Sequence, residues 1–299
     1  MEIKKIELSE LKNNFIVPKK EKPLPQSESE WMATKVFSLE AIKVGENEIQ
    51  CAFSQGGRGN SVTAMVGGLP RDPSRREKLP LINKLYGNLA VELSHRRESS
   101  VLYNQPGTGR STGDWEKGTI TTRAHVLTEV SKYFYIKGEA SSLAIVGTSA
   151  GGYMAVRALD ELQKNGVVVS KLALLSPAAY PESVEEIPYG ENFSNTIRTP
   201  WDVSTSPIFP LLTKFVKEGG SVLITFFEHD DPPIPRHIQE YYKSFVKELS
   251  DAGGDIEIVI IEGVAHNFRK IGIAEGDNIV DNQSVRVTTS KLTSFLTNT

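Results

Sequence analysis

The stretch that decides the fold is SLAIVGTSAGGYMAVRALDEL, residues 142–162. It opens with a short apolar run over 143–146, typical of a strand that is buried on both faces of a parallel sheet. A helical pattern follows from about Gly151 to Lys164. Between them, Gly147-Thr148-Ser149-Ala150-Gly151 matches G-x-S-x-G, a strand-to-helix turn that exposes a serine hydroxyl.

This turn makes Ser149 a candidate nucleophile. A serine held between a strand and a helix needs very small neighbours, because the two backbones pass close together. Gly147, Gly151 and Gly152 satisfy that need. At the start of the helix, free N–H groups and the helix dipole would favour a developing oxyanion. The simpler interpretation is a glycine-rich turn with a capping serine, and the strand–turn–helix context favours the nucleophile.

Outward from this turn, apolar runs alternate with helical patterns. We expect strands at 35–44, 48–54, 62–66, 100–103, 143–146, 171–175, 221–227 and 256–261, and helices at 81–96, 122–135, 151–164 and 284–296. Such alternation predicts an α/β fold with a mostly parallel central sheet and helices on both faces. Active sites in such sheets lie at the carboxyl ends of the strands, so we expect the chemistry in the turns that follow them.

Two regions fall outside this alternation. Residues 1–30 are rich in Lys, Glu, Pro and Ser, and we expect them to form a loose N-terminal arm. Residues 31–299 then form one domain. Within it, 178–210 lacks clear periodicity and carries several Pro and aromatic residues. We interpret that segment as a small lid inserted above the sheet.

A base and an acid for Ser149 are expected further along the chain. His266 comes after the last expected strand, in the sequence Gly-Val-Ala-His-Asn-Phe, where it can accept the serine proton. Asp230 and Asp231 directly follow the strand at 221–227 and supply a carboxylate to orient the imidazole. We favour Asp231, which precedes Pro232, and keep Asp230 as the alternative acid.

Four motifs in order resemble the α/β-hydrolase superfamily over about residues 35–296. Gly67-Gly68-Leu69-Pro70 resembles its oxyanion loop, where His-Gly is commoner, and 104–111 resembles its D-x-P-G-x-G-x-S turn with Asn104 in place of Asp. The serine turn is the third motif. The fourth, 231–235, resembles the acid turn D-P-x-x-P, and His266 completes the set.

The resemblance implies a serine hydrolase that acts through an acyl-enzyme. The backbone N–H groups of Leu69 and Ala150 would then bind the oxyanion. Within the superfamily the chain looks closest to small-lid esterases, acylglycerol lipases and serine aminopeptidases. A small acyl ester or a peptide is therefore the expected substrate.

Composition narrows the remaining classes of function. The 299 residues carry a formal net charge of −3, which does not favour a nucleic-acid partner. A single cysteine and five histidines do not suggest a zinc site, and we expect neither a metal nor a cofactor. A membrane-spanning helix needs about 18 consecutive apolar residues, and no stretch of the sequence comes near that length. We therefore expect a cytoplasmic protein. Oligomeric state cannot be read from these patterns.

Two questions stay open at this point. The rival from another class is a catalytically silent scaffold that binds a ligand or a partner. Ester and peptide are also undecided, because the aromatic residues of 178–210 either line an acyl pocket or only pack the lid onto the domain. Glu182, Glu185 and Glu186 either attract the free amine of a peptide or form a solvated face.

Overall fold

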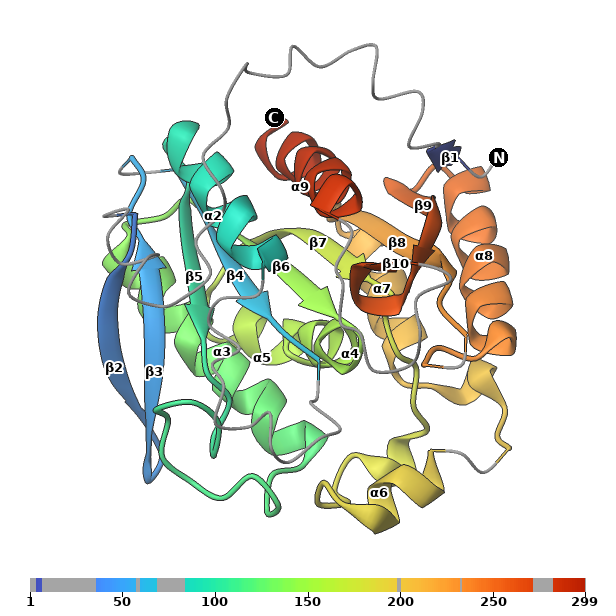
Figure 1. Cartoon of the computed structure of the whole chain (residues 1–299), viewed down its shortest axis with the longest axis horizontal. Coiled ribbons are helices and arrows are strands. Elements are labelled where there is room, and N and C mark those ends of the chain that lie inside the picture. The colour runs from blue at the N-terminus through green and yellow to red at the C-terminus, as the bar shows by residue number, and fades with distance from the viewer. Residues whose placement is uncertain are drawn as a thin grey trace.

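The computed structural model describes residues 4–6, 36–57, 60–68, 84–197, 200–231, 233–270 and 282–298. These residues form a sheet with helices on both sides (Figure 1). The strands run in the order β1-β9-β8-β7-β6-β4-β5-β3-β2, with β10 beside β9. All neighbours from β1 to β5 along this order are parallel, whereas β3, β2 and β10 are antiparallel to their partners.

The elements have the following bounds. The strands are β1 Lys4–Ile6, β2 Ser38–Val44, β3 Asn47–Ser54, β4 Ser61–Val66, β5 Ser99–Tyr103, β6 Ser142–Thr148, β7 Val169–Leu175, β8 Ser221–His229, β9 Ile256–Ala265 and β10 Arg269–Lys270. The α-helices are α2 Lys84–His95, α3 Ile120–Lys137, α4 Ala150–Arg157, α5 Leu159–Lys164, α6 Glu191–Thr196, α7 Ile208–Lys217, α8 Arg236–Asp251 and α9 Asn282–Thr297. Short 3-10 turns are η4 Glu182–Val184, η5 Val203–Thr205 and η6 His266–Phe268.

The sheet separates two hydrophobic cores. Side chains of α3, α4, α5, α7 and α8 pack against one face, and those of α2 and α9 pack against the other (Figure 1). Strand β6 contributes alternately to both, since Leu143 and Ile145 enter the first core while Ala144 and Val146 enter the second. This explains why β6 reads as a continuous apolar run.

The register brings the carboxyl ends of the central strands level with one another. Val66 of β4 pairs with Gly147 of β6, and Thr148 of β6 pairs with Leu175 of β7. Leu175 in turn pairs with Thr225 of β8. The turns that follow β4, β6 and β7 therefore all lie at the carboxyl-terminal end of the sheet.

The expected α/β class with a mostly parallel sheet is confirmed, while several element boundaries differ. The single helix expected at 151–164 is divided at Ala158 into α4 and α5. Strand β9 continues to Ala265, four residues beyond the expected end. The amphipathic helix α7 was not expected as a helix, and its first residues lie within the segment assigned to a lid.

The N-terminal region also differs from the expected loose arm in one place. Lys4–Ile6 forms β1, which pairs in parallel with β9, for example Lys5 opposite Ile260. The rest of 1–30 lies outside the described residues. Among the described helices, none is both long enough and apolar enough to span a bilayer.

Candidate active site

Ser149 occupies a strained turn between β6 and α4. Its backbone has φ 55° and ψ −123°, a left-handed conformation that non-glycine residues rarely adopt. Glycines make the turn possible. A Cβ added to Gly147 would lie 2.5 Å from the carbonyl oxygen of Gly151, and one added to Gly151 would lie 2.4 Å from that of Val66. The expected strand–turn–helix geometry is therefore present, and it leaves Ser149 partly exposed.

The next strand fixes the backbone of Ser149. Its N–H donates to the carbonyl of Leu175 at 2.9 Å, and its carbonyl accepts from the N–H of Ala178 at 3.1 Å. Ala150, the expected oxyanion donor, is the first residue of α4. Its N–H is one of the helix N-terminal donors that have no acceptor within their own helix. A backbone donor thus directly follows the serine.

The loop after β4 approaches the same serine. A Cβ added to Gly68 would lie 3.0 Å from the Cβ of Ser149, so only glycine allows the loop this close. The hydroxyl of Tyr86, from α2, joins the two turns by hydrogen bonds to the carbonyl of Val66 at 2.8 Å and to Thr148 Oγ1 at 2.5 Å. Leu69, the other expected oxyanion donor, lies outside the described residues.

His266 stands at the carboxyl end of β9 and contacts Asp230. Its Nδ1 lies 2.7 Å from Asp230 Oδ1. Both groups are buried, since the imidazole side chain is 10% exposed and the carboxylate is 0% exposed. Because Nδ1 is on a buried carboxylate, Nε2 is the ring nitrogen left to act as a base; serine-based triads have the same division between the two nitrogens.

The preference for Asp231 over Asp230 as the carboxylate beside His266 is wrong. Asp231 is exposed, and Asp230 makes the contact. The physical reason is an irregularity in the pairing of β8 with β9, whose register shifts between Phe227 and His229. The turn that follows is closed by the N–H of Ile234 on the carbonyl of Asp230. It keeps Asp230 inside and places the next carboxylate in solvent.

Ser176, the residue that follows β7, was not predicted from the sequence. Its Oγ donates to Asp230 Oδ2 at 2.6 Å, and the N–H of Phe227 donates to the same oxygen at 2.7 Å. The one available signal was its position directly after a central parallel strand, where functional side chains gather. The contacts now connect His266, Asp230 and Ser176, and the neighbouring carbonyl of Leu175 reaches Ser149.

Glu185, in the expected lid, is not a solvated acid. It is 6% exposed and accepts hydrogen bonds from Arg157 and from the hydroxyl of Tyr153, at 2.9 and 2.5 Å. Burial, followed by the bond to Glu185, raises the pKa of Tyr153 well above its usual value. Glu182 and Glu186 are exposed, as expected for a solvated face. This cluster anchors the 178–210 segment to α4.

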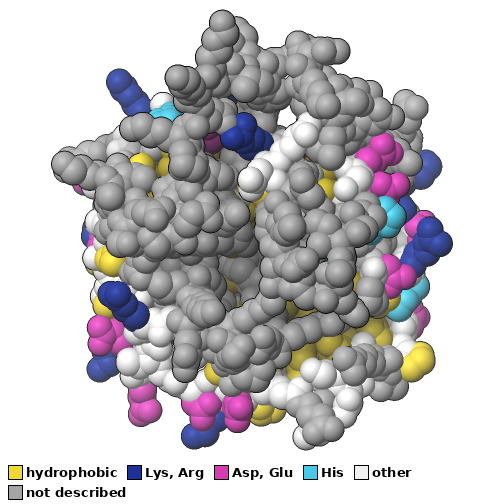
Figure 2. Space-filling model, viewed as in Figure 1, with side chains coloured by type: hydrophobic (Ala, Val, Ile, Leu, Met, Phe, Trp, Pro, Cys, Tyr) yellow, Lys and Arg dark blue, Asp and Glu magenta, His cyan; other side chains and the backbone are white. Residues whose placement is uncertain are grey.

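The aromatic residues of 178–210 pack against one another and against the domain. Tyr180 lies 5.1 Å from the ring of Tyr153, and Phe193 contacts both Tyr180 and Tyr189. Phe193 and Tyr189 are buried, whereas Tyr180 and Trp201 are partly buried. Hydrophobic side chains are visible at the surface close to this segment, between α6 and α8 (Figure 2). Packing thus accounts for most of the aromatic content, and the role of a lid stays a prediction.

The turn around Asn104 is a structural element of the sheet edge. Asn104 is 0% exposed and donates through Nδ2 to Gln50 Oε1 at 3.2 Å. Ser111 Oγ donates to the carbonyl of Asn104 and accepts from the N–H of Gln50. These bonds tie the turn after β5 to β3. The amide Nδ2 of Asn104 thus gives Gln50 Oε1 a donor, while the buried Asn104 Oδ1 has no hydrogen-bond partner among the described residues.

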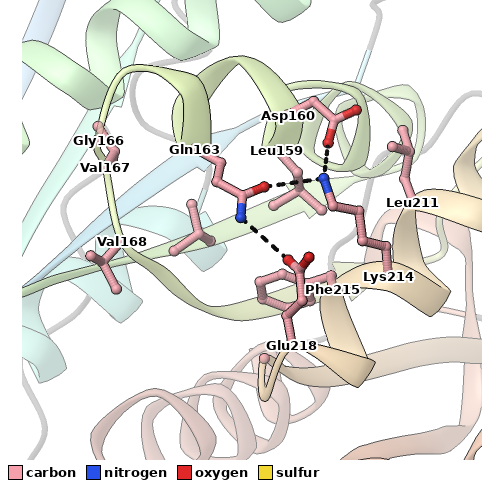
Figure 3. A pocket seen from close by; sticks show the side chains of 12 residues that line it. Leu159, Asp160, Gln163, Gly166, Val167, Val168, Leu211, Lys214, Phe215 and Glu218 are labelled. Carbon is pink, nitrogen blue, oxygen red and sulfur yellow. Dashed lines mark hydrogen bonds and ion pairs between the residues drawn. The ribbon is translucent and has the colours of Figure 1, made fainter.

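A groove of about 300 Å³ lies between α5 and α7, at the end of the sheet opposite to Ser149 (Figure 3). Its polar side chains bond across it, with Lys214 Nζ on Asp160 at 2.8 Å and on Gln163 at 3.2 Å, and Gln163 Nε2 on Glu218 at 3.3 Å. It borders the amino-terminal ends of β7 and β8, far along the strands from Ser149. It takes no part in the candidate site.

Metal ligands do not gather in the part of the chain that the structure describes. No group of three or more His, Cys, Asp or Glu side chains there has the spacing to hold a metal ion. The lone Cys51 is buried in β3, and burial raises the pKa of its thiol to about 12. It is therefore a neutral core residue at ordinary pH.

Comparison with solved structures supplies the fold name. XC6422 from Xanthomonas campestris, described as an α/β serine hydrolase without a lid, covers 87% of this chain and 91% of its own length, with 14% identity and a TM-score of 0.54. The chain has the α/β-hydrolase fold. The serine turn lies between β6 and α4, as the G-x-S-x-G pattern predicted.

Two further α/β-hydrolase structures are similar over comparable lengths. Est1E from Butyrivibrio proteoclasticus is 12% identical, covers 86% of this chain and 97% of its own, and gives a TM-score of 0.56. An arylesterase is 13% identical, covers 87% of this chain and 83% of its own, and gives a TM-score of 0.59. A scan against protein-family models and a search of curated proteins each found no match. These identities establish the α/β-hydrolase fold and leave the reaction to be argued from the site.

Proposed function

We propose that this protein is a serine hydrolase that cleaves a small ester, thioester or amide through an acyl-enzyme on Ser149. The observation that carries the proposal is the strained backbone of Ser149, at φ 55°, in a turn tied through β7 to the buried Asp230–His266 pair. Strain at a non-glycine residue persists where the surroundings enforce it, which is common at active sites. A catalytically silent scaffold would gain nothing from either feature.

Each residue has a defined part in the proposed reaction. His266 Nε2 accepts the proton of Ser149 as its Oγ attacks the carbonyl carbon, and the imidazolium then protonates the leaving group. Water attacks the acyl-enzyme in the same way, returning the proton to Oγ and releasing the acid. Asp230 orients the imidazole and stabilises its charged form. The N–H groups of Ala150 and Leu69 are proposed to bind the oxyanion.

An ester is the favoured substrate class. Glu185 was the buried candidate for attracting a peptide amine, and its charge is already neutralised by Arg157 at 2.8 Å. Two of the similar structures point the same way, since one is named an arylesterase and Est1E has been solved with ferulic acid bound. We therefore propose small aromatic or short-chain carboxylic esters ahead of peptides.

The test compares turnover of p-nitrophenyl acetate, butyrate and octanoate by the wild type, Ser149→Ala and His266→Ala. We expect wild-type activity that falls by about 10⁴-fold or more in each variant, because nucleophile and base act as a unit. A fluorophosphonate should label the wild type on Ser149 and leave Ser149→Ala unlabelled. Intact folding of each variant is checked by its melting temperature. A wild type that neither turns over esters nor reacts with the probe would favour the silent scaffold.

A further inference from the structure

Ser176 holds the side of Asp230 that faces away from His266. Its hydroxyl is fully buried and donates to Oδ2 at 2.6 Å, while His266 Nδ1 contacts Oδ1 at 2.7 Å. The N–H of Phe227 donates to Oδ2 as well, at 2.7 Å. Two donors on one oxygen fix the rotation of the carboxylate, and hydrogen bonds to a charged acceptor are the strong ones.

The backbone of Ser176 is itself strained. Its φ is +43°, in the left-handed region that non-glycine residues rarely occupy. Its N–H donates to the carbonyl of Thr225 in β8 at 2.6 Å, which holds it in that conformation. Glycine would adopt this backbone without strain, yet the chain has a hydroxyl there.

The residues around Ser176 hold Ser149. The carbonyl of Leu175 accepts from the N–H of Ser149, and the N–H of Ala178 donates to its carbonyl. Pro177 lies close to α4, since a Cβ added to Gly152 would be only 2.9 Å from the Cβ of Pro177. The segment 175–178 therefore hydrogen-bonds both to the backbone of the candidate nucleophile, Ser149, and to the carboxylate of the candidate acid, Asp230.

We propose that Ser176 is a positioning residue for the hydrolysis, acting through Asp230 on the orientation of His266 relative to Ser149. The inference rests on the proposed function. Without the hydroxyl, Oδ2 keeps only the N–H of Phe227, and the carboxylate can rotate. The imidazole then spends less time aligned for proton transfer, which slows the chemical steps and leaves substrate binding unchanged.

The test uses Ser176→Ala and Ser176→Gly, with ester turnover and melting temperature measured for both. We expect kcat to fall by about tenfold in each variant with KM within about twofold of the wild type. Glycine relieves the strained backbone, so Ser176→Gly should melt at or above the temperature of Ser176→Ala while losing the same activity. Ser131→Ala, which removes another fully buried serine hydroxyl on α3, is the control and should leave kcat unchanged.

A second measurement separates this proposal from the proposed function. Proton NMR of the wild type should show a far-downfield resonance from the Nδ1 proton of His266, absent in His266→Ala, and Ser176→Ala should shift or broaden it. This readout needs no turnover, so it tests whether Ser176 orients Asp230 and His266 even when the wild type proves inactive and the proposed function fails. An unchanged resonance, or a kcat that Ser176→Gly restores, overturns the role of Ser176.

Discussion

Replacing Asp230 by asparagine keeps the size of the side chain but changes the group that hydrogen-bonds to Nδ1 of His266. The carboxylate is 0% exposed, and its Oδ2 accepts from Ser176 and from the N–H of Phe227. In the variant, the single amide oxygen must serve those two donors, because otherwise two buried donors would be unpaired. The NH₂ group then faces Nδ1 of His266, which must become the acceptor. The proton moves to Nε2, the nitrogen that the mechanism needs as a base.

The expected loss in kcat is about 10⁴-fold, the size seen when a triad aspartate is replaced by asparagine. That factor corresponds to about 5.4 kcal/mol of transition-state stabilisation. The assay measures ester turnover by Asp230→Asn and by Asp231→Asn. Because the carboxylate of Asp231 is exposed, its replacement should lower kcat by less than about threefold. Melting curves of both variants check folding. Equal losses, or a larger loss in Asp231→Asn, would refute the assignment of Asp230.

Two further predictions concern the scaffold. Gly151→Ala should lower the free energy of unfolding by about 2–3 kcal/mol, because the new Cβ would lie 2.4 Å from the carbonyl oxygen of Val66. The control is Gly190→Ala, whose Cβ would lie in open space and should hardly change the melting temperature. Glu185→Gln should cost about 2 kcal/mol, or roughly 3 °C in Tm for a chain of 299 residues, because it leaves a partly buried guanidinium without its counter-charge. The exposed Glu182→Gln is its control in the same melting assay, and equal Tm values for the two would contradict a structural role for the Glu185 pair.

The serine turn was predictable from sequence because its requirements are local. A strand, a serine between glycines and a helix appear in one short stretch, and the glycines are needed for close backbone contacts that the structure contains. The position of His266 in the candidate site was predictable because this residue directly follows the last long strand. The α/β class followed from the alternation of apolar runs and helical patterns.

The choice between Asp230 and Asp231 was not predictable in this way. Two adjacent carboxylates have the same local signals, and the register shift of β8 against β9 decides which one turns inward. Ser176 was missed for a related reason, since its partner is 54 residues away on another strand. Strand β1 has only three residues and forms through its pairing with β9. Each of these features depends on contacts between distant segments.

The order of the central strands has a consequence for the protein during its synthesis. Strands β6, β7, β8 and β9 are neighbours in space in the same order as in the chain, and each supplies the next part of the site. The carbonyl that holds Ser149 belongs to β7, so its turn cannot be fixed until that strand has left the ribosome and paired. Asp230 and His266 emerge later still, and α9 is the only described helix after them. If hydrolysis depends on this site, a growing chain stays inactive until β9 and the turn that follows it have been made.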